Sequence, residues 1–279
     1  MRNPRFIDAS VTGGILHVCI NRPEKRNALS PAVLAELGAT FLEQSENPQL
    51  IATTLTGAGA KCFAAGGDLK EMEAVRSVEA TMRMHHESIA ALDAIRFFPV
   101  PVVALLNGDA IGGGAELALA CDMRVFAAHS RFALVQANLG ISPGWGGGAD
   151  LVRLVGAARA LRLLARAEFL DAGAALALGL ADAVASPSTS FETCVSDFME
   201  PLAQRKPQVM RALKALAGAG RKTPEWTVLR ELEAANLRAT WLHEDHWSAS
   251  AQALARISGS RNPRANSPAV TRRPVFKGG

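Results

Sequence analysis

The fold is decided by Asn107-Gly108-Asp109-Ala110-Ile111-Gly112-Gly113-Gly114-Ala115-Glu116. This stretch follows the apolar run Val100-Pro101-Val102-Val103-Ala104-Leu105-Leu106, which indicates a buried strand. It precedes Leu117-Ala118-Leu119-Ala120, which favours a helix. The glycines allow a ligand to reach bare backbone N–H groups at the positive end of a helix dipole. We therefore expect a strand, a glycine turn and a helix start that suit an anion or a group that becomes anionic.

Strand and helix patterns alternate on both sides of this stretch. Residues 5–11 and 14–20 predict a β-hairpin around Gly13-Gly14. Ser30-Pro31 predicts the start of a helix that runs to about Ser45, because serine caps a helix and proline suits its first position. From about residue 191 onward the pattern is helical throughout. The alternation predicts an α/β fold with a parallel core and a helical C-terminal region.

Composition narrows the class of protein. Half of the 279 residues are apolar, and no apolar run reaches the length of a membrane span. Tyrosine is absent and aromatic residues make up 5%, which argues against base-stacking surfaces for nucleic acid. The formal charge of +4 comes from residues 260–279, which hold five basic residues and no acidic one. Four widely spaced cysteines indicate reduced thiols. We expect a cytoplasmic protein with no nucleic-acid or membrane partner.

Four motifs in order along the chain resemble the crotonase (enoyl-CoA hydratase/isomerase) superfamily over residues 6–258. They are Asn21–Leu29, Phe63–Met72, Pro101–Asp122 and Leu139–Gly147. The resemblance implies a spiral of ββα units, and we expect the crotonase core at 1–200 and a C-terminal helical region at 201–259. The Pro, Asn, Ser and Arg of residues 260–279 cannot bury a core, so their composition predicts a disordered basic tail. It also implies a homotrimer, often doubled to a hexamer.

The resemblance further implies how the protein handles a substrate. Family members bind an acyl-CoA and hold its thioester carbonyl between two backbone N–H groups, which match Ala65 and Gly113 here. These donors stabilise an enolate oxygen, and losing one such donor costs about 3–4 kcal/mol of transition-state stabilisation. Coenzyme A is then part of the substrate and no separate cofactor is needed. A carrier protein's pantetheine arm could present the thioester instead.

The acid–base groups depart from the hydratase pattern. Typical hydratases place two glutamates around one water molecule, and these positions match Glu116 and Gln136 here. An amide cannot serve as a general acid or base, so Gln136 disfavours hydration and isomerisation that depend on a second carboxylate. Decarboxylation of a malonyl-type thioester needs no general base, and details around Asn138 and Trp145 are similar to the methylmalonyl- and ethylmalonyl-CoA decarboxylases.

Three other functions remain as alternatives. One is an enoyl-CoA hydratase or isomerase that uses Glu116 alone, and another is a non-catalytic acyl-CoA-binding subunit. A dinucleotide-dependent oxidoreductase is disfavoured, because Thr56-Gly57-Ala58-Gly59 lacks the third glycine and the helix that such a loop requires.

The remaining site residues follow from the same resemblance. The residues that it places around the substrate are Lys25, Arg26, Ala28, Gly66, Gly67, Asp68, Leu69, Gly112, Asn138, Pro143 and Trp145. Asp68 and Asp122 also have structural interpretations, as a helix cap and as a hydrogen-bonding group at a strand end. His85-His86 and the His243/His246 pair lack a third ligand at metal spacing, so we assign no metal.

Overall fold

The computed structural model describes residues 6–186, 188–222, 244–245 and 248. The chain divides into two compact units, Met1–Leu232 and Glu233–Gly279, and the elements below belong to the first. The part of the predicted helical region that follows residue 222 lies outside the described residues, apart from 244–245 and 248. The predicted tail at 260–279 also lies outside them.

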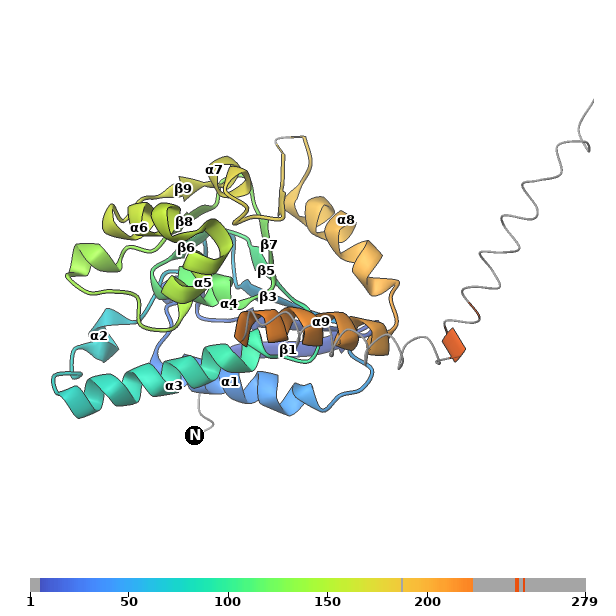
Figure 1. The fold of residues 1–279 in the computed structure, drawn as a ribbon, viewed down its shortest axis with the longest axis horizontal. Helices are drawn as coiled ribbons and strands as arrows, with labels where there is room; N and C mark the ends of the chain where they lie inside the picture. The colour runs from blue at the N-terminus through green and yellow to red at the C-terminus, as the bar shows by residue number, and fades with distance from the viewer. Residues whose placement is uncertain (1–5, 187, 223–243, 246–247, 249–279) are drawn as a thin grey trace, which may run out of the picture. The chain divides into compact units, whose positions relative to one another are not determined.

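Two sheets form the framework of the first unit (Figure 1). The strands of the larger sheet, in spatial order, are β1 (Ile7–Thr12), β2 (Ile15–Ile20), β3 (Ala52–Gly57), β5 (Val102–Leu106), β7 (Met123–Phe126) and β10 (Ala183–Val184). Those of the smaller sheet are β4 (Cys62–Ala64), β6 (Asp109–Ile111), β8 (Arg131–Ala133) and β9 (Leu170–Asp171). The pairs β1–β2 and β8–β9 are antiparallel, and every other pair is parallel.

Successive strands alternate between the two sheets. The chain enters the larger sheet at β3, β5 and β7, and after each of these it adds a strand, β4, β6 or β8, to the smaller one. A helical segment follows each such pair before the chain returns to the larger sheet. This repetition is the ββα spiral that the sequence predicts, and the α/β fold class is confirmed.

The helices surround this framework. Those that lie between β2 and β10 in the sequence are α1 (Pro31–Ser45), α2 (Leu69–Met72), α3 (Val78–Arg96), α4 (Gly113–Ala120), α5 (Gly147–Val155), α6 (Ala157–Ala165) and α7 (Ala172–Ala177). The C-terminal part adds α8 (Phe191–Ala203) and α9 (Pro207–Lys222), and short 3₁₀ turns lie at η1 (Pro23–Lys25) and η2 (Gln136–Leu139). None of the described helices is both long enough and apolar enough to cross a bilayer.

Local sequence signals account for several of these boundaries. The β1–β2 turn uses Gly13 and Gly14, both with positive φ, as the predicted hairpin requires. Ser30 caps α1 by accepting a hydrogen bond from the Val33 N–H (3.3 Å). All eight residues of α4 are buried, and Glu116 is the one charged side chain among them. Its N-terminus, at the end of β6, is where the site forms.

Candidate active site

A cavity of about 910 Å³ lies around the N-terminus of α4. The chain reaches it from six places: the loop after β4, the segment from α2 into α3, the start of α4, the residues around η2, the loop before α5, and Phe169 just before β9. Of the predicted site residues, those that line the cavity are Ala65, Gly66, Gly67, Leu69, Gly112, Gly113, Glu116, Gln136, Asn138, Pro143 and Trp145. The spiral thus brings together segments that are far apart in the sequence.

Gly113 is the first residue of α4, so its backbone N–H has no partner within the helix. It also donates no hydrogen bond to any other residue that the structure describes. A Cβ atom at Gly113 would lie 2.2 Å from Cζ3 of the Trp145 indole, so only glycine fits against this ring. The N–H of Gly113 is therefore a donor at the positive end of a helix and can meet an oxyanion.

Ala65 requires a correction, because the fold itself uses its N–H. That group donates to the carbonyl oxygen of Arg26 (3.1 Å) and is not directed at a ligand. Two residues after Ala65, Gly67 forms a parallel bridge with Leu29. In this bridge the Leu29 N–H donates to the Gly66 carbonyl (2.8 Å), and the Leu29 carbonyl accepts from the Asp68 N–H (3.2 Å). In a parallel bridge these bonds leave the N–H of the opposed residue, Gly67, pointing the other way.

The Gly67 N–H donates no hydrogen bond to any residue in the described part of the chain. A Cβ atom at Gly67 would lie 3.5 Å from Cη2 of Trp145, so the indole that covers Gly113 also reaches Gly67. Gly67, predicted as a substrate contact, takes over the donor role that the sequence assigns to Ala65. Gly67 and Gly113 are the pair of N–H groups that the geometry offers to an oxyanion.

Glu116 lies on the first turn of α4 and is 2% exposed. Gln136 Nε2 donates to its Oε1 (2.8 Å), and the N–H groups of Trp145 and Gly147 donate to its Oε2 (2.8 and 3.0 Å). Burial raises the pKa of this carboxyl, while hydrogen bonds from Trp145, Gly147, Gly144 and Gln136 act in the opposite direction. Oε2 therefore holds the loop before α5 through two backbone N–H groups, whereas Oε1 accepts one hydrogen bond and keeps a lone pair.

Gln136 presents an acceptor that has no partner. Its Oε1 is buried and accepts no hydrogen bond from the described residues, because Nε2 is turned toward Glu116. Exchanging the two amide atoms would place Oε1 against a carboxylate oxygen, which is repulsive while Glu116 is ionised. One N–H of Nε2 is used by Glu116, and the amide keeps a second N–H that can donate to a ligand.

The loop Pro143–Gly147, which we call the Trp145 loop, is held from a second side by Arg96. This guanidinium is 5% exposed, and it donates to the carbonyl oxygen of Trp145 (2.8 Å) and to Asp150 Oδ2 (2.8 Å). Asp93 accepts a third bond (3.0 Å). Glu116 thus accepts from the N–H groups of the loop while Arg96 donates to a carbonyl, which fixes the indole that covers both glycines.

His85, on α3, lines the cavity and was not among the predicted site residues. Its Nδ1 lies 2.7 Å from the carbonyl oxygen of Gly144. A carbonyl can only accept, so Nδ1 must carry the hydrogen and Nε2 is the ring nitrogen that can accept or deliver a second proton. The sequence offers little signal for this role, because the contact joins residues 59 positions apart.

The predicted residues Lys25, Arg26, Ala28 and Asp68 do not line the cavity. Asp68 instead caps α2 by accepting from the Glu71 N–H (3.4 Å), and it pairs with Arg22 (2.8 Å). These bonds join the segment around η1 to the loop after β4. The helix-cap interpretation of Asp68 is confirmed, and its direct contact with a ligand in the cavity is not supported.

Asp122 also has the structural role that the sequence indicates. Its Oδ2 accepts from the N–H of Val102 at the start of β5 (2.8 Å), and Lys214 pairs with the same carboxylate (2.5 Å). Among the described residues, no three His, Cys, Asp or Glu side chains gather as a metal site would require.

Comparisons with known proteins agree with this geometry. The sequence model of the enoyl-CoA hydratase/isomerase family matches residues 10–255. A short-chain-enoyl-CoA hydratase of Clostridium acetobutylicum is 36% identical over 181 residues, which cover 65% of this chain and 69% of that protein. An ethylmalonyl-CoA decarboxylase of Xenopus tropicalis is 32% identical over 217 residues, which cover 77% of this chain and 72% of that protein.

The crystal structure of an enoyl-CoA hydratase from Bacillus anthracis matches with a TM-score of 0.82 at 29% identity. The match covers 93% of this chain and 98% of that one. Family match, sequence similarity and fold thus indicate the same family. The chain belongs to the enoyl-CoA hydratase/isomerase family, the crotonase superfamily.

Proposed function

We propose that this protein removes carbon dioxide from a malonyl-type acyl-CoA thioester. One observation carries the proposal: the cavity pairs two backbone N–H donors with a single carboxylate that faces an amide. Gly67 and Gly113 supply the donors, and Gln136 donates to Glu116, the one carboxylate among the described residues that line the cavity. Such a site can stabilise an enolate oxygen but lacks the second carboxylate that would serve as the partner acid or base in hydration.

The charge distribution of the cavity favours the same reaction. No lysine or arginine is among the described residues that line it, so a substrate carboxylate there would lack a cationic partner. When the bond between the α-carbon and the carboxylate breaks, its electron pair forms the enolate, and the negative charge moves to the thioester oxygen between Gly67 and Gly113. These donors are preorganised for charge that develops in the transition state.

A proton must then reach the α-carbon, and His85 is the candidate donor. An imidazolium can act as a general acid, and here its transferable proton would sit on Nε2, since Nδ1–H is bonded to the Gly144 carbonyl. Transfer from Nε2 to the α-carbon lets the enolate collapse to the thioester. The ring is left neutral and regains its proton from solvent.

An enoyl-CoA hydratase or isomerase that uses Glu116 alone is the second candidate. The names of several relatives favour it, including a crotonyl-CoA hydratase of Syntrophomonas wolfei that is 33% identical over 206 residues. In this chain, however, Gln136 stands where a second carboxylate would complete the acid–base pair, and Glu116 is the one carboxylate among the described residues that line the cavity. The second candidate therefore requires Glu116 to serve as both base and acid.

Two assays decide between these functions. We expect carbon dioxide release from methylmalonyl-CoA or ethylmalonyl-CoA and negligible hydration of crotonyl-CoA. The Gln136→Glu variant places a second carboxyl at hydrogen-bonding distance from Glu116 and should raise hydration while leaving decarboxylation no faster. Rapid hydration by the native protein without carbon dioxide release would overturn the proposal. Tight binding of all these thioesters without turnover would indicate a non-catalytic acyl-CoA-binding subunit.

We also infer a cytoplasmic homotrimer or homohexamer, on the strength of the family resemblance. Sedimentation velocity of the full chain tests the assembly state. A monomer at micromolar concentration would contradict it.

A further inference from the structure

The direction of the Gly67 N–H depends on a single bridge between two loops. Gly67 and Leu29 are opposed in one parallel pair that belongs to neither sheet. Beside it, the same two segments share one more backbone bond in the described part of the chain, from the Ala65 N–H to the Arg26 carbonyl (3.1 Å). So short a ladder cannot by itself fix the donor, and the side chains that hold the two segments together become important.

A buried guanidinium spans this bridge. Arg22 is 7% exposed, and its Nη1 donates to the carbonyl oxygen of Ala28 (3.2 Å) and to Asp68 Oδ2 (2.8 Å). Ala28 directly precedes Leu29, and Asp68 directly follows Gly67. One nitrogen atom therefore holds both segments next to the bridged pair.

The guanidinium is itself fixed on several sides. Its Nη2 donates to Glu71 Oε1 (2.9 Å) in the first turn of α2, and its Cζ lies 5.7 Å from the centroid of the Phe6 ring. The backbone of Arg22 is bonded twice to the fully buried Asn27: its N–H donates to Oδ1 (3.1 Å), and its carbonyl accepts from the Asn27 N–H (2.9 Å). The planar fork thus has one orientation, from which it reaches three acceptors.

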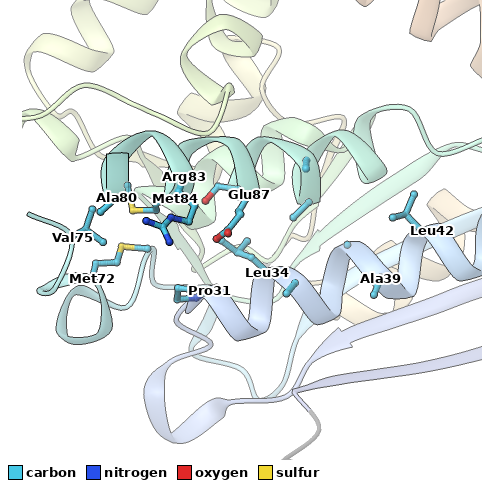
Figure 2. A pocket seen from close by; sticks show the side chains of 15 residues that line it. Pro31, Leu34, Ala39, Leu42, Met72, Val75, Ala80, Arg83, Met84 and Glu87 are labelled. Carbon is cyan, nitrogen blue, oxygen red and sulfur yellow. The ribbon is translucent and has the colours of Figure 1, made fainter. Parts of the chain in front are cut away.

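Packing on the other side of the loop is less complete. A Cβ atom on Gly67 would lie 2.8 Å from Cε and 2.9 Å from Sδ of Met72, so this methionine covers Gly67. Among the described residues, Met72 also borders a hollow of about 600 Å³ between α1 and α3, and Figure 2 shows its side chain there beside Met84. A flexible thioether next to open space restrains the loop weakly. The polar contacts of Arg22 therefore provide the firmer restraint.

We propose that Arg22 is a positioning residue for the oxyanion hole, because its hold on Ala28 and Asp68 keeps the Gly67 N–H directed at the thioester oxygen. This inference rests on the proposed function only in that this oxygen lies between Gly67 and Gly113. Arg22 does not line the cavity and so acts through the donor. Displacement of a catalytic group by about 1 Å can cost about 10²-fold in rate.

The stretching frequency of a bound thioester carbonyl tests this role without turnover. Butanoyl-CoA labelled with ¹³C at the carbonyl carbon would be added to the full-length protein and measured by infrared difference spectroscopy. Two N–H donors should lower the frequency relative to the free thioester, and Arg22→Met should lose roughly half of this lowering, because one of the two donors is misdirected. An unchanged band in Arg22→Met, or no lowering in the native protein, would overturn the proposal.

Two further variants separate positioning from general loss of stability. Arg211 on α9 also joins distant segments, by donating to the carbonyl oxygen of Asn47 (2.6 Å), and it lines neither the cavity nor the hollow. Arg211→Met should keep the native band, and an equal change in this variant would show that the effect is not specific. Arg22→Lys keeps a cation beside Asp68 without the planar fork, so its band should lie between those of the native protein and Arg22→Met. If Arg22→Met does not fold, a native band in Arg22→Lys overturns the proposal.

Turnover separates this inference from its premise. With a malonyl-type thioester, kcat of Arg22→Met should fall about 10- to 100-fold while KM changes less than about threefold, because the donor acts mainly in the transition state. A raised KM with an unchanged kcat would assign Arg22 to ground-state binding and contradict the proposal. If the infrared band changes as expected while the native protein releases no carbon dioxide, the positioning role stands and the decarboxylase proposal fails.

Discussion

The two walls of the active-site cavity differ in how they are held. The Trp145 loop is bonded by three side chains from two helices: Glu116 on α4 accepts from its N–H groups, and Arg96 and His85 on α3 donate to its carbonyls. The opposite wall, Leu69–Met84, is built mainly from exposed or half-buried side chains, with Leu69 62% and Met82 43% exposed. We call this segment the methionine wall.

The ion pairs that hold the methionine wall are fewer and more exposed to solvent. Glu71 pairs with Arg22 at 2.9 Å, although the Glu71 side chain is 43% exposed. Arg76 and Glu73 pair within the segment at 4.0 Å, and both side chains are more than 70% exposed. The difference between the walls indicates a division of labour: the side that positions the indole over Gly67 and Gly113 is rigid, and the side that meets the acyl chain can adapt.

Removing the guanidinium that holds the rigid wall should have the largest effect. Arg96→Met leaves Asp150, which is 8% exposed, as a buried carboxylate without its cation and frees the Trp145 carbonyl. Loss of one partner of a buried pair costs about 3–5 kcal/mol. Urea unfolding measures this cost. Arg76→Met breaks the exposed pair with Glu73 and should cost less than about 1 kcal/mol. Similar costs for the two variants would contradict the contrast between the walls.

The oxyanion donor on α4 can be removed with a built-in control. Gly113→Pro eliminates the N–H at the first helical position, where proline is conformationally tolerated, and Gly113→Ala keeps the N–H. Both variants add a Cβ atom that meets the Trp145 indole, so this clash is common to the pair. We expect kcat for Gly113→Pro to be about 10²- to 10³-fold below that of Gly113→Ala. Equal kcat values would remove Gly113 from the oxyanion hole.

Glu116, which accepts hydrogen bonds from the Trp145 loop, should make the free energy of unfolding depend on pH. Burial raises the pKa of Glu116 above 4.5, so the folded state binds this proton more tightly than the unfolded chain does. The contribution of Glu116 to the free energy of unfolding is therefore fully present below pH 4.5 and is lost as the pH rises through the folded-state pKa. Above that value the native carboxylate is buried and ionised, which destabilises the fold.

The Glu116→Gln variant should lack this dependence. Its amide cannot ionise, and a turned Gln136 can accept from it through the oxygen that is unpartnered in the native protein. Relative to the native protein, the variant should become more stable as the pH rises from 4 to 8. Urea unfolding across this range provides the measurement, and Glu73→Gln, at an exposed carboxylate, serves as the control. A stability difference that does not change with pH would show that Glu116 does not titrate as described.

Local signals predicted much of this arrangement, and long-range contacts account for what they missed. The Gly13-Gly14 turn, the Ser30 cap and the N–H of Gly113 each depend on neighbouring residues, so sequence patterns identify them. The choice between Ala65 and Gly67 depends on the bridge from Leu29, which aligns two distant segments. The roles of Arg96 and His85 depend on contacts across 54 and 59 positions, which composition and spacing do not reveal.

The smallest effect is expected in the methionine wall, and it bears most directly on how the substrate fits. Met84→Ala shortens a half-buried side chain, so it should cost about 1 kcal/mol of stability, whereas Met210→Ala removes a side chain that is 3% exposed in α9 and should cost about 2–5 kcal/mol. Urea unfolding of the two variants gives the comparison. An equal cost would show that Met84 is packed as tightly as the core, and the methionine wall would then be as rigid as the Trp145 loop. A low cost together with an unchanged kcat for short thioesters would show that this wall can move without disturbing Gly67 and Gly113.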